Sequence, residues 1–257
     1  MPKKDFSYAI LDDLAHRPYP LPKRPWIMTQ SWHDLLFAHW PIDVGTTQAA
    51  LPALFAPDQW DGHAWLGVVP FHMTNVAPRG VPALPGLSAF PELNVRTYVS
   101  VDGRAGVYFF SLDAGNPLAV IAARWLFDLP YFSAAMNVAE QDGWIAYDHR
   151  RTSRKAPPAA WQARYRPVGG ARTPEPGSLE YFLTERYCLY TSSPSNHPRR
   201  VDIHHPPWTL QRAEADIALN TIADAAGIRL PQVAPLLHFA KRQDVVAWLP
   251  VGATHAG

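Results

Sequence analysis

The segment Phe90–Val101 alternates between polar and apolar residues, and it constrains the fold more than any other part of the chain. One face carries Glu92, Asn94, Arg96, Tyr98 and Ser100, and the other carries Leu93, Val95, Thr97, Val99 and Val101. A period of two predicts a β-strand with one buried face. The polar side chains, about 6.6–7 Å apart along the strand, have two interpretations. They line a polar cavity, or they form a solvated face with an incidental Glu92–Arg96 pair.

Turns and further alternating segments extend this strand into a sheet. Residues 102–106 predict a tight turn that brings residues 107–112 back as the antiparallel partner. A second hairpin is predicted over residues 135–149, and further strands over residues 64–76, 161–167, 187–190 and 239–249. Pro70 cannot donate to a strand ladder, so it predicts an edge position or a bulge. Strands outnumber helices without β-α-β alternation, which predicts an α+β fold with an antiparallel sheet, curled into a barrel or cone.

Apolar spacings of three and four predict several helices among these strands. The first covers residues 29–40 and ends at Pro41. A second covers residues 117–126, with Asn116 as its N-cap. Two more are expected over residues 178–187 and 213–226, the last of them ended by Gly227.

The first 27 residues differ in texture from the rest of the chain. Residues 16–25 contain four prolines and three lysine or arginine residues, which is typical of an extended linker. We therefore expect an N-terminal leader over residues 1–27, which need not be ordered, and a single domain over residues 28–257. A chain of 257 residues with 47% hydrophobic residues is long and apolar enough for one such domain.

Composition excludes several classes of function. A formal net charge of +1 gives no support for a nucleic-acid partner or an acidic membrane surface. We find no signal peptide and no apolar run long enough to cross a bilayer, so we expect a cytoplasmic protein with no membrane partner. The single cysteine, Cys188, excludes an intrachain disulfide and a four-thiolate zinc site.

Familiar catalytic and cofactor motifs are absent from the sequence. It has no glycine-rich dinucleotide or phosphate loop, no nucleophile elbow and no His-Glu-x-x-His motif, so we expect no cofactor. His204 and His205 are adjacent and would face opposite sides of a strand, so we expect no metal site. None of the five lysines has a setting that would keep its amine neutral for Schiff-base chemistry: Lys3, Lys4, Lys23, Lys155 and Lys241.

Ordered blocks along most of the chain resemble the YqjF-like family of uncharacterised bacterial proteins, also known as domain of unknown function 2071. The matching blocks lie at residues 30–41, 61–71, 90–98, 106–114, 123–124, 130–131, 183–187 and 203–208. The resemblance spans roughly residues 28–249. The family is itself similar in fold to acetoacetate decarboxylase. That similarity implies a double-layered antiparallel β-cone with a polar cavity inside and a few helices outside.

The resemblance also implies which residues line the cavity. In the decarboxylase, a lysine that follows a Phe-Pro pair forms the Schiff base, and Tyr131 occupies its position here. The carboxylate on the cavity strand matches Glu92, so we expect Glu92 and Tyr131 as the catalytic pair, without imine chemistry. Arg96 and Arg124 are candidates to bind a carboxylate or enolate oxygen, because guanidinium is a planar donor fork. We expect further contacts with the ligand from His72, Asn94, Tyr98 and Tyr108.

Two functions from different classes fit these residues. The first is a lyase, hydratase or isomerase that acts on a small oxo-acid or carbonyl compound without a Schiff-base lysine. The second is a non-catalytic protein that binds a small organic acid or an apolar metabolite in the same cavity. For Glu185 and Arg186 we favour a fold-stabilising pair over a place in the cavity. A small-molecule ligand is the expected partner, and the many tryptophans and prolines are compatible with a homo-oligomer.

Overall fold

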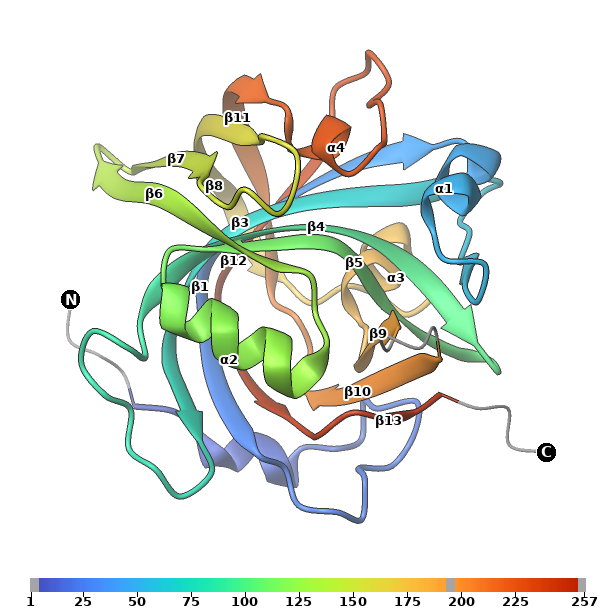
Figure 1. Cartoon of the computed structure of the whole chain (residues 1–257), viewed down its shortest axis with the longest axis vertical. Helices are drawn as coiled ribbons and strands as arrows, with labels where there is room; N and C mark the ends of the chain where they lie inside the picture. Colours follow the sequence, from blue (N-terminus) through green and yellow to red (C-terminus); the bar gives the residue numbers. More distant parts are fainter. Residues whose placement is uncertain (1–4, 193–196, 254–257) are drawn as a thin grey trace.

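The structure, a computed structural model, is built on one large sheet that curls back on itself (Figure 1). It describes residues 5–192 and 197–253. The strands are β1 (Met28–Ile42), β2 (Ala56–Pro57), β3 (Ala64–Pro78), β4 (Phe90–Val101), β5 (Arg104–Ala114), β6 (Tyr131–Gln141), β7 (Trp144–Arg151), β8 (Ala160–Arg172), β9 (Cys188–Ser192), β10 (Pro198–His204), β11 (Leu210–Asn220), β12 (Leu236–Ala247) and β13 (Val251–Gly252). The helices are η1 (Tyr8–Asp12), α1 (Val44–Ala50), α2 (Pro117–Phe127), α3 (Leu179–Thr184) and α4 (Ile222–Ala225).

Seven strands close into a ring in the order β5, β4, β3, β1, β12, β10, β9 and back to β5. Every pairing in this ring is antiparallel except the last, in which β5 and β9 run parallel through Val107 opposite Leu189 and Tyr108 opposite Tyr190. A closed ring leaves no free sheet edge around its circumference. The seven strands therefore form a small barrel.

A second layer covers one side of this barrel. Strands β6, β7, β8 and β11 continue from β5 and return to β12, so the sheet makes a second loop. Leu93 and Val95 of β4 pack between the layers against aromatic side chains such as Tyr147 and Trp161. The structure therefore confirms the predicted α+β fold with a double-layered β-cone.

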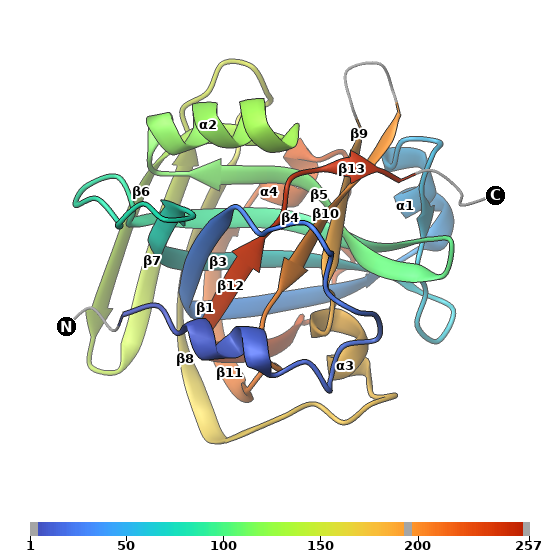
Figure 2. The same cartoon turned by 90° about the horizontal axis from the view of Figure 1, so that it is seen from below.

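Helices lie at the two ends of the barrel, and Figure 2 shows α2 and α3 on opposite sides of the strands. Helix α2 leaves the end of β5, and the backbone carbonyl of Asp128 behind it accepts a hydrogen bond from Thr191 of β9 at 2.6 Å. Helix α3 packs Leu183 against Tyr98 of β4 at the opposite end. Within residues 5–192 and 197–253, no helix combines the length and apolarity needed to cross a bilayer.

Local sequence signals for the hairpins and for two helices are confirmed. Asp102 and Gly103 both have positive φ, at 51° and 72°, as a two-residue hairpin turn requires. Asn116 accepts a hydrogen bond from the amide of Leu118 at the start of α2. Pro70 lies opposite the register shift between His33 and Ala38 of β1, so the predicted bulge is present.

The helix predicted over residues 29–40 is wrong, because this segment lies in strand β1. It lies between β12 and β3 and is covered on both faces, so Leu36, Phe37 and Ala38 are all fully buried in succession. A strand buried on both faces carries a continuous apolar run, and such a run also contains the spacings of a helix.

The helix predicted over residues 213–226 is also wrong for most of its length. Strand β11 continues to Asn220, and only Ile222–Ala225 is helical, ending before Gly227. Alanines favour a helix, but here Arg212, Glu214 and Asp216 alternate with half-buried residues. Backbone pairing with β8 and β12 holds this strand, and two exposed ion pairs lie on its outer face: Arg164–Asp216 and Arg166–Glu214.

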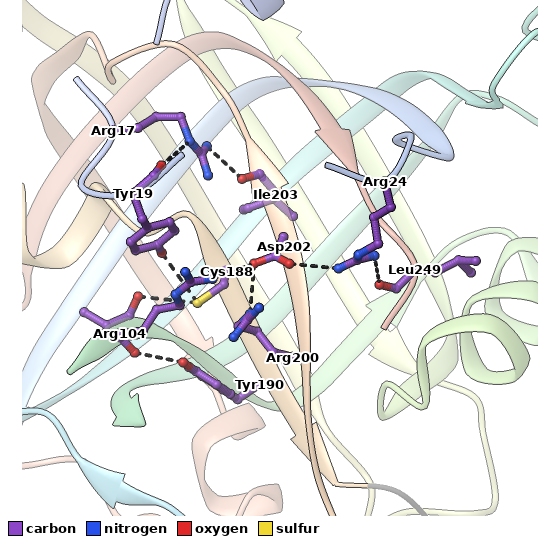
Figure 3. A network of polar contacts seen from close by, with 11 residues as sticks. Arg17, Tyr19, Arg24, Arg104, Cys188, Tyr190, Arg200, Asp202, Ile203 and Leu249 are labelled. Carbon is purple, nitrogen blue, oxygen red and sulfur yellow. Dashed lines mark hydrogen bonds and ion pairs between the residues drawn. The ribbon is translucent and has the colours of Figure 1, made fainter. Parts of the chain in front are cut away.

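The N-terminal segment packs along the barrel, and Figure 3 shows its polar contacts. The Tyr19 hydroxyl donates to the Cys188 Sγ at 3.7 Å, and Arg17 donates to the carbonyl of Ile203 at 3.0 Å. Arg24 pairs with Asp202 at 2.8 Å, and Asp202 also accepts from Arg104 and Arg200. Residues 17–24 therefore lie behind the barrel wall formed by β9 and β10.

A buried ionic network joins the two layers and predicts a large loss of stability on substitution. Asp113 of β5 accepts hydrogen bonds from Arg151 at 2.8 Å and from His149 at 2.7 Å, and all three side chains are almost fully buried. Asp113→Asn would leave the Arg151 charge without compensation and should lower the free energy of unfolding by about 3–5 kcal/mol in urea denaturation. The control, Asp216→Asn, breaks an exposed pair and should cost less than about 1 kcal/mol. Equal losses in the two variants would contradict this account.

Candidate functional site

A cavity of about 270 Å³ lies inside the seven-strand barrel. All seven strands of the ring contribute side chains to its wall, together with residues of α2 and α3. The wall is mostly apolar, with a small number of polar side chains: Gln30, Glu92, Asn94, Arg96, Tyr131, Thr184, Arg186, Cys188 and His205. An apolar pocket with a few convergent polar groups is the usual form of a small-molecule site.

Strand β4 supplies the polar row that the sequence predicts. Glu92, Asn94 and Arg96 point into the cavity, while Leu93 and Val95 point into the core between the layers. No ion pair joins Glu92 to Arg96 in the part of the chain that the structure describes. Of the two interpretations of this strand, the cavity wall is therefore the one that the structure bears out.

Glu92 and Tyr131 form a hydrogen-bonded pair on this wall. The Tyr131 hydroxyl donates to Glu92 Oε2 at 2.8 Å, and Glu92 is only 3% exposed. Tyr131 is the first residue of β6, and it reaches Glu92 because β6 pairs with β5 beside Leu112. The two residues that the sequence predicts as a catalytic pair are thus brought together.

Burial changes the acidity of both members of this pair. It raises the pKa of Glu92 to about 7, although hydrogen bonds from Tyr131 and Asn94 act in the opposite direction. Burial and the neighbouring Glu92 carboxylate raise the pKa of Tyr131 well above its usual value. Glu92 can therefore gain or lose a proton near neutral pH, while Tyr131 remains a hydrogen-bond donor.

Arg96 is a buried cation without a carboxylate partner among the described residues. It is 8% exposed and donates to the Tyr98 hydroxyl at 3.2 Å and to the carbonyl of Leu183 at 3.3 Å. Its guanidinium also lies over the ring of Phe37, 5.1 Å from the centroid. Its Nε atom has no hydrogen-bond partner within the described ranges. A buried guanidinium is normally paired, so this one is suited to an anionic ligand.

Tyr98 lies behind Arg96 and fixes its position. The Tyr98 hydroxyl accepts from Arg96 and therefore directs its own proton to Nε2 of His39, at 2.6 Å. Burial, and then the nearby Arg96 charge, lowers the pKa of His39 well below its usual value, so this histidine is a neutral acceptor. Gly67 leaves the space for this arrangement, because a Cβ there would lie 3.0 Å from His39 Nε2 and 3.3 Å from Arg96 Cγ.

Two other predicted contacts, Tyr108 and His72, are not brought to the cavity. Tyr108 packs outside the barrel against Phe55, because Val107 and Phe109 take the inward positions of β5. His72 stacks on His33 on the outer face of β3, between the inward-facing Phe71 and Met73. Arg124 lies in α2, and its side chain is outside the described part of the structure.

Arg186 lines the cavity, which is the alternative that the sequence analysis did not favour for this residue. It pairs with Asp58 at 2.6 Å, whereas Glu185 accepts from the amide of Trp208 at 2.8 Å and from Tyr187. The expected Glu185–Arg186 pair is therefore wrong, because each residue has its own partner. Adjacent side chains after a short helix give no sequence signal for two separate partners.

Neither a lysine nor a metal cluster is found at the cavity in the described ranges. No lysine among the described residues contributes to its wall. Across residues 5–192 and 197–253, no three histidine, cysteine, aspartate or glutamate side chains gather to form a metal site. The ionisable side chains that do line the described part of this wall include Glu92, Tyr131, Arg96 and Arg186.

The model of the family called domain of unknown function 2071 (DUF2071), described as an uncharacterized conserved protein, matches residues 29–244. The chain belongs to the DUF2071 family. It is 50% identical over 228 residues to the uncharacterized protein YqjF of Bacillus subtilis (strain 168), a match that covers 89% of this chain and 93% of that protein.

Solved structures similar to this DUF2071 protein share its fold at low sequence identity. Acetoacetate decarboxylase from Legionella pneumophila has a TM-score of 0.62 at 11% identity and covers 100% of both chains. The enduracididine biosynthesis enzyme MppR, complexed with pyruvate, has a TM-score of 0.60 at 11% identity and covers 91% of this chain and 93% of its own. An acetoacetate decarboxylase-like enzyme from Sphingomonas wittichii RW1 has a TM-score of 0.58 at 14% identity, covering 88% and 92%. The DUF2071 chain thus has an acetoacetate decarboxylase-like fold.

The raised pKa of Glu92 predicts how stability depends on pH. Between pH 4.5 and pH 7 the unfolded chain ionises this residue while the folded protein keeps it protonated. As the pH rises from 4.5 to 7, the free energy of unfolding of the wild type should therefore fall by about 3 kcal/mol relative to that of the Glu92→Gln variant. Urea denaturation at several pH values measures the difference, with the exposed Glu175→Gln as the control for the same substitution. A difference between wild type and Glu92→Gln that does not change with pH would contradict the assignment.

Proposed function

We propose that this protein binds a carbonyl-containing organic acid in the barrel cavity and transfers a proton at the carbon next to the carbonyl group. No Schiff-base lysine takes part, and the reaction class is that of an isomerase, a hydratase or another lyase. One observation carries the proposal: the buried Glu92–Tyr131 pair lies on the same cavity wall as Arg96, a cation without a carboxylate partner in the described ranges.

Arg96 is the group that would bind the acid. A carboxylate within reach of its guanidinium would accept charge-assisted hydrogen bonds and neutralise a charge that is otherwise buried without a counter-ion. Arg186 adds a second cation to the wall, with its charge shared with Asp58. Together the two arginines can stabilise negative charge that develops on the carbonyl oxygen.

Glu92 is the group that would move the proton. Its ionised carboxylate takes a proton from the carbon next to the carbonyl, and the electrons of that C–H bond form an enolate. In a substrate with a β,γ-double bond this enolate is a dienolate, and the protonated Glu92 returns the proton to its γ-carbon while the double bond moves to the α,β position, which completes an isomerisation. Alternatively, the enolate expels a β-hydroxyl group, which takes the proton from Glu92 and leaves as water. A base with a pKa of about 7 suits either step at neutral pH.

The similar structures support the choice of ligand. MppR was solved with pyruvate bound, so a barrel of this type holds an oxo-acid in that protein. This chain has the same fold, and in its cavity the Tyr131 hydroxyl donates a hydrogen bond to Glu92. No lysine lies on the described part of the wall. A small carbonyl acid is therefore the proposed partner, and a cytoplasmic location suits such a metabolite.

A second candidate function is non-catalytic binding of an organic acid or an apolar metabolite. The observation that favours it is the composition of the cavity wall, which is mostly apolar. The same arginines would hold the acid, but Glu92 would transfer no proton to or from it. The two functions therefore differ in turnover and not in affinity.

Exchange of solvent deuterium into 2-oxo acids, followed by proton NMR, tests the proposal. Wild-type protein should catalyse exchange next to the carbonyl group, with a rate that rises with pH and levels off above about 7. Glu92→Gln should reduce the rate by about 10²–10⁴-fold and largely keep the affinity for the acid. Arg96→Gln should weaken binding by about tenfold to a hundredfold, the loss of a charged hydrogen bond.

Tyr131→Phe provides the control for the role of Glu92. The Tyr131 hydrogen bond lowers the pKa of Glu92, so its removal should move the inflection of the pH profile to higher pH without abolishing exchange. Wild type that binds 2-oxo acids without exchange would favour the binding protein. Exchange that persists unchanged in Glu92→Gln would overturn the assignment of the base.

A further inference from the structure

The cavity has a polar end and an apolar end along the barrel axis. Arg96 of β4 pairs with Gly67 of β3, and Phe90 of β4 pairs with Met73 of β3. Arg96 and Phe90 are six residues apart, which is about 20 Å along a β-strand. Glu92 lies between them, opposite Phe71. The proton-transfer pair therefore stands between the cationic end and an apolar end lined by Phe90 and Met73.

The cationic end is closed to solvent. Arg96, Thr184 and Arg186 all line it, and each is less than a tenth exposed. Helix α3 covers this end, since Arg96 donates to the carbonyl of Leu183 and Leu183 is fully buried. A carboxylate bound here would lie at the closed end of the barrel.

The apolar end is open beneath α2. Leu126 of α2 lines the cavity and is still 41% exposed, and the exposed Pro78 also lines it. Pro78 pairs with Met28 of β1 at the same end of the barrel, and both contribute to the wall. Helix α2 lies in front of the barrel strands (Figure 1) and runs from the end of β5 toward β9. Its residues Leu126 and Phe127 line the cavity at this end.

An acid of the size of pyruvate would occupy only the cationic end and leave most of the apolar wall uncovered. The cavity of about 270 Å³ is close to the lower limit for pockets that hold drug-sized ligands, about 300 Å³. We infer that the ligand is a carbonyl acid with an extended apolar tail, a straight chain or an aryl group, whose carboxylate binds Arg96 and whose tail points along the barrel toward α2. This inference rests on the proposed function and names the substrate class of the same site.

A series of saturated carboxylates tests the tail separately from catalysis. Isothermal titration calorimetry with propanoate, butanoate, hexanoate and octanoate should show affinity that increases about threefold to fourfold for each methylene that enters the apolar end. Leu126→Asp should weaken octanoate binding by about tenfold, because it places a charge beside the tail, and should leave propanoate binding unchanged. The control is Leu118→Asp on the same helix, which is 61% exposed and outside the cavity wall, and it should change neither affinity.

Each contrary outcome has a distinct meaning. Equal affinity along the series, or loss of binding beyond butanoate, would overturn the inference that the ligand has an apolar tail. If propanoate still bound in a way that depends on Arg96, the proposed function would stay intact. Equal effects of Leu126→Asp and Leu118→Asp would likewise overturn the placement of the tail under α2. Failure of the wild type to bind any of the four acids would overturn the inference and the proposed function together.

Discussion

The parallel contact between β5 and β9 closes the barrel, and the cavity depends on that closure. It occurs beside Gly106, where a Cβ would lie 2.6 Å from Tyr190 and 2.8 Å from Cys188 Sγ, so only glycine lets the two strands meet. With the ring closed, the polar face of β4 is enclosed. Enclosure desolvates Glu92 and leaves Arg96 in an apolar setting. Both properties on which the proposed chemistry relies thus follow from one strand pairing.

Parts of the fold that are encoded locally could be predicted from the sequence. The alternation of β4, its hairpin turn at Asp102 and the start of α2 at Asn116 all depend on neighbouring residues. Strands β1 and β11 could not be predicted in the same way. The first is buried on both faces, and the second is paired with β8 and β12, so tertiary contacts override a helix-like spacing in both. The closure of the ring also has no local signal.

The candidate site, like the fold, combines residues that the sequence predicts to lie together with residues that only tertiary packing brings together. Glu92, Asn94 and Arg96 share a strand face, so periodicity predicts that they lie together, and the family resemblance adds Tyr131 from a distant segment. Tyr108 and His72 are also expected in the cavity, but the alternation of side chains along β5 and β3 places both on the outer face of the barrel. His39 behind Tyr98, and Arg186 beside the cavity, are brought there by packing of separate elements. No spacing in the sequence relates them to β4.

Direct titration of the Glu92 carboxyl group tests the central claim of this account most directly. Infrared difference spectra of wild type minus Glu92→Gln isolate the carbonyl band of the protonated acid, from pH values below 4.5 to values above 7. The account predicts that this band disappears with a midpoint of about pH 7, because the closed barrel keeps the carboxyl group away from water. A midpoint near the ordinary value of 4.5 would show that Glu92 is solvated, and would contradict the enclosed site and the proton transfer proposed for it.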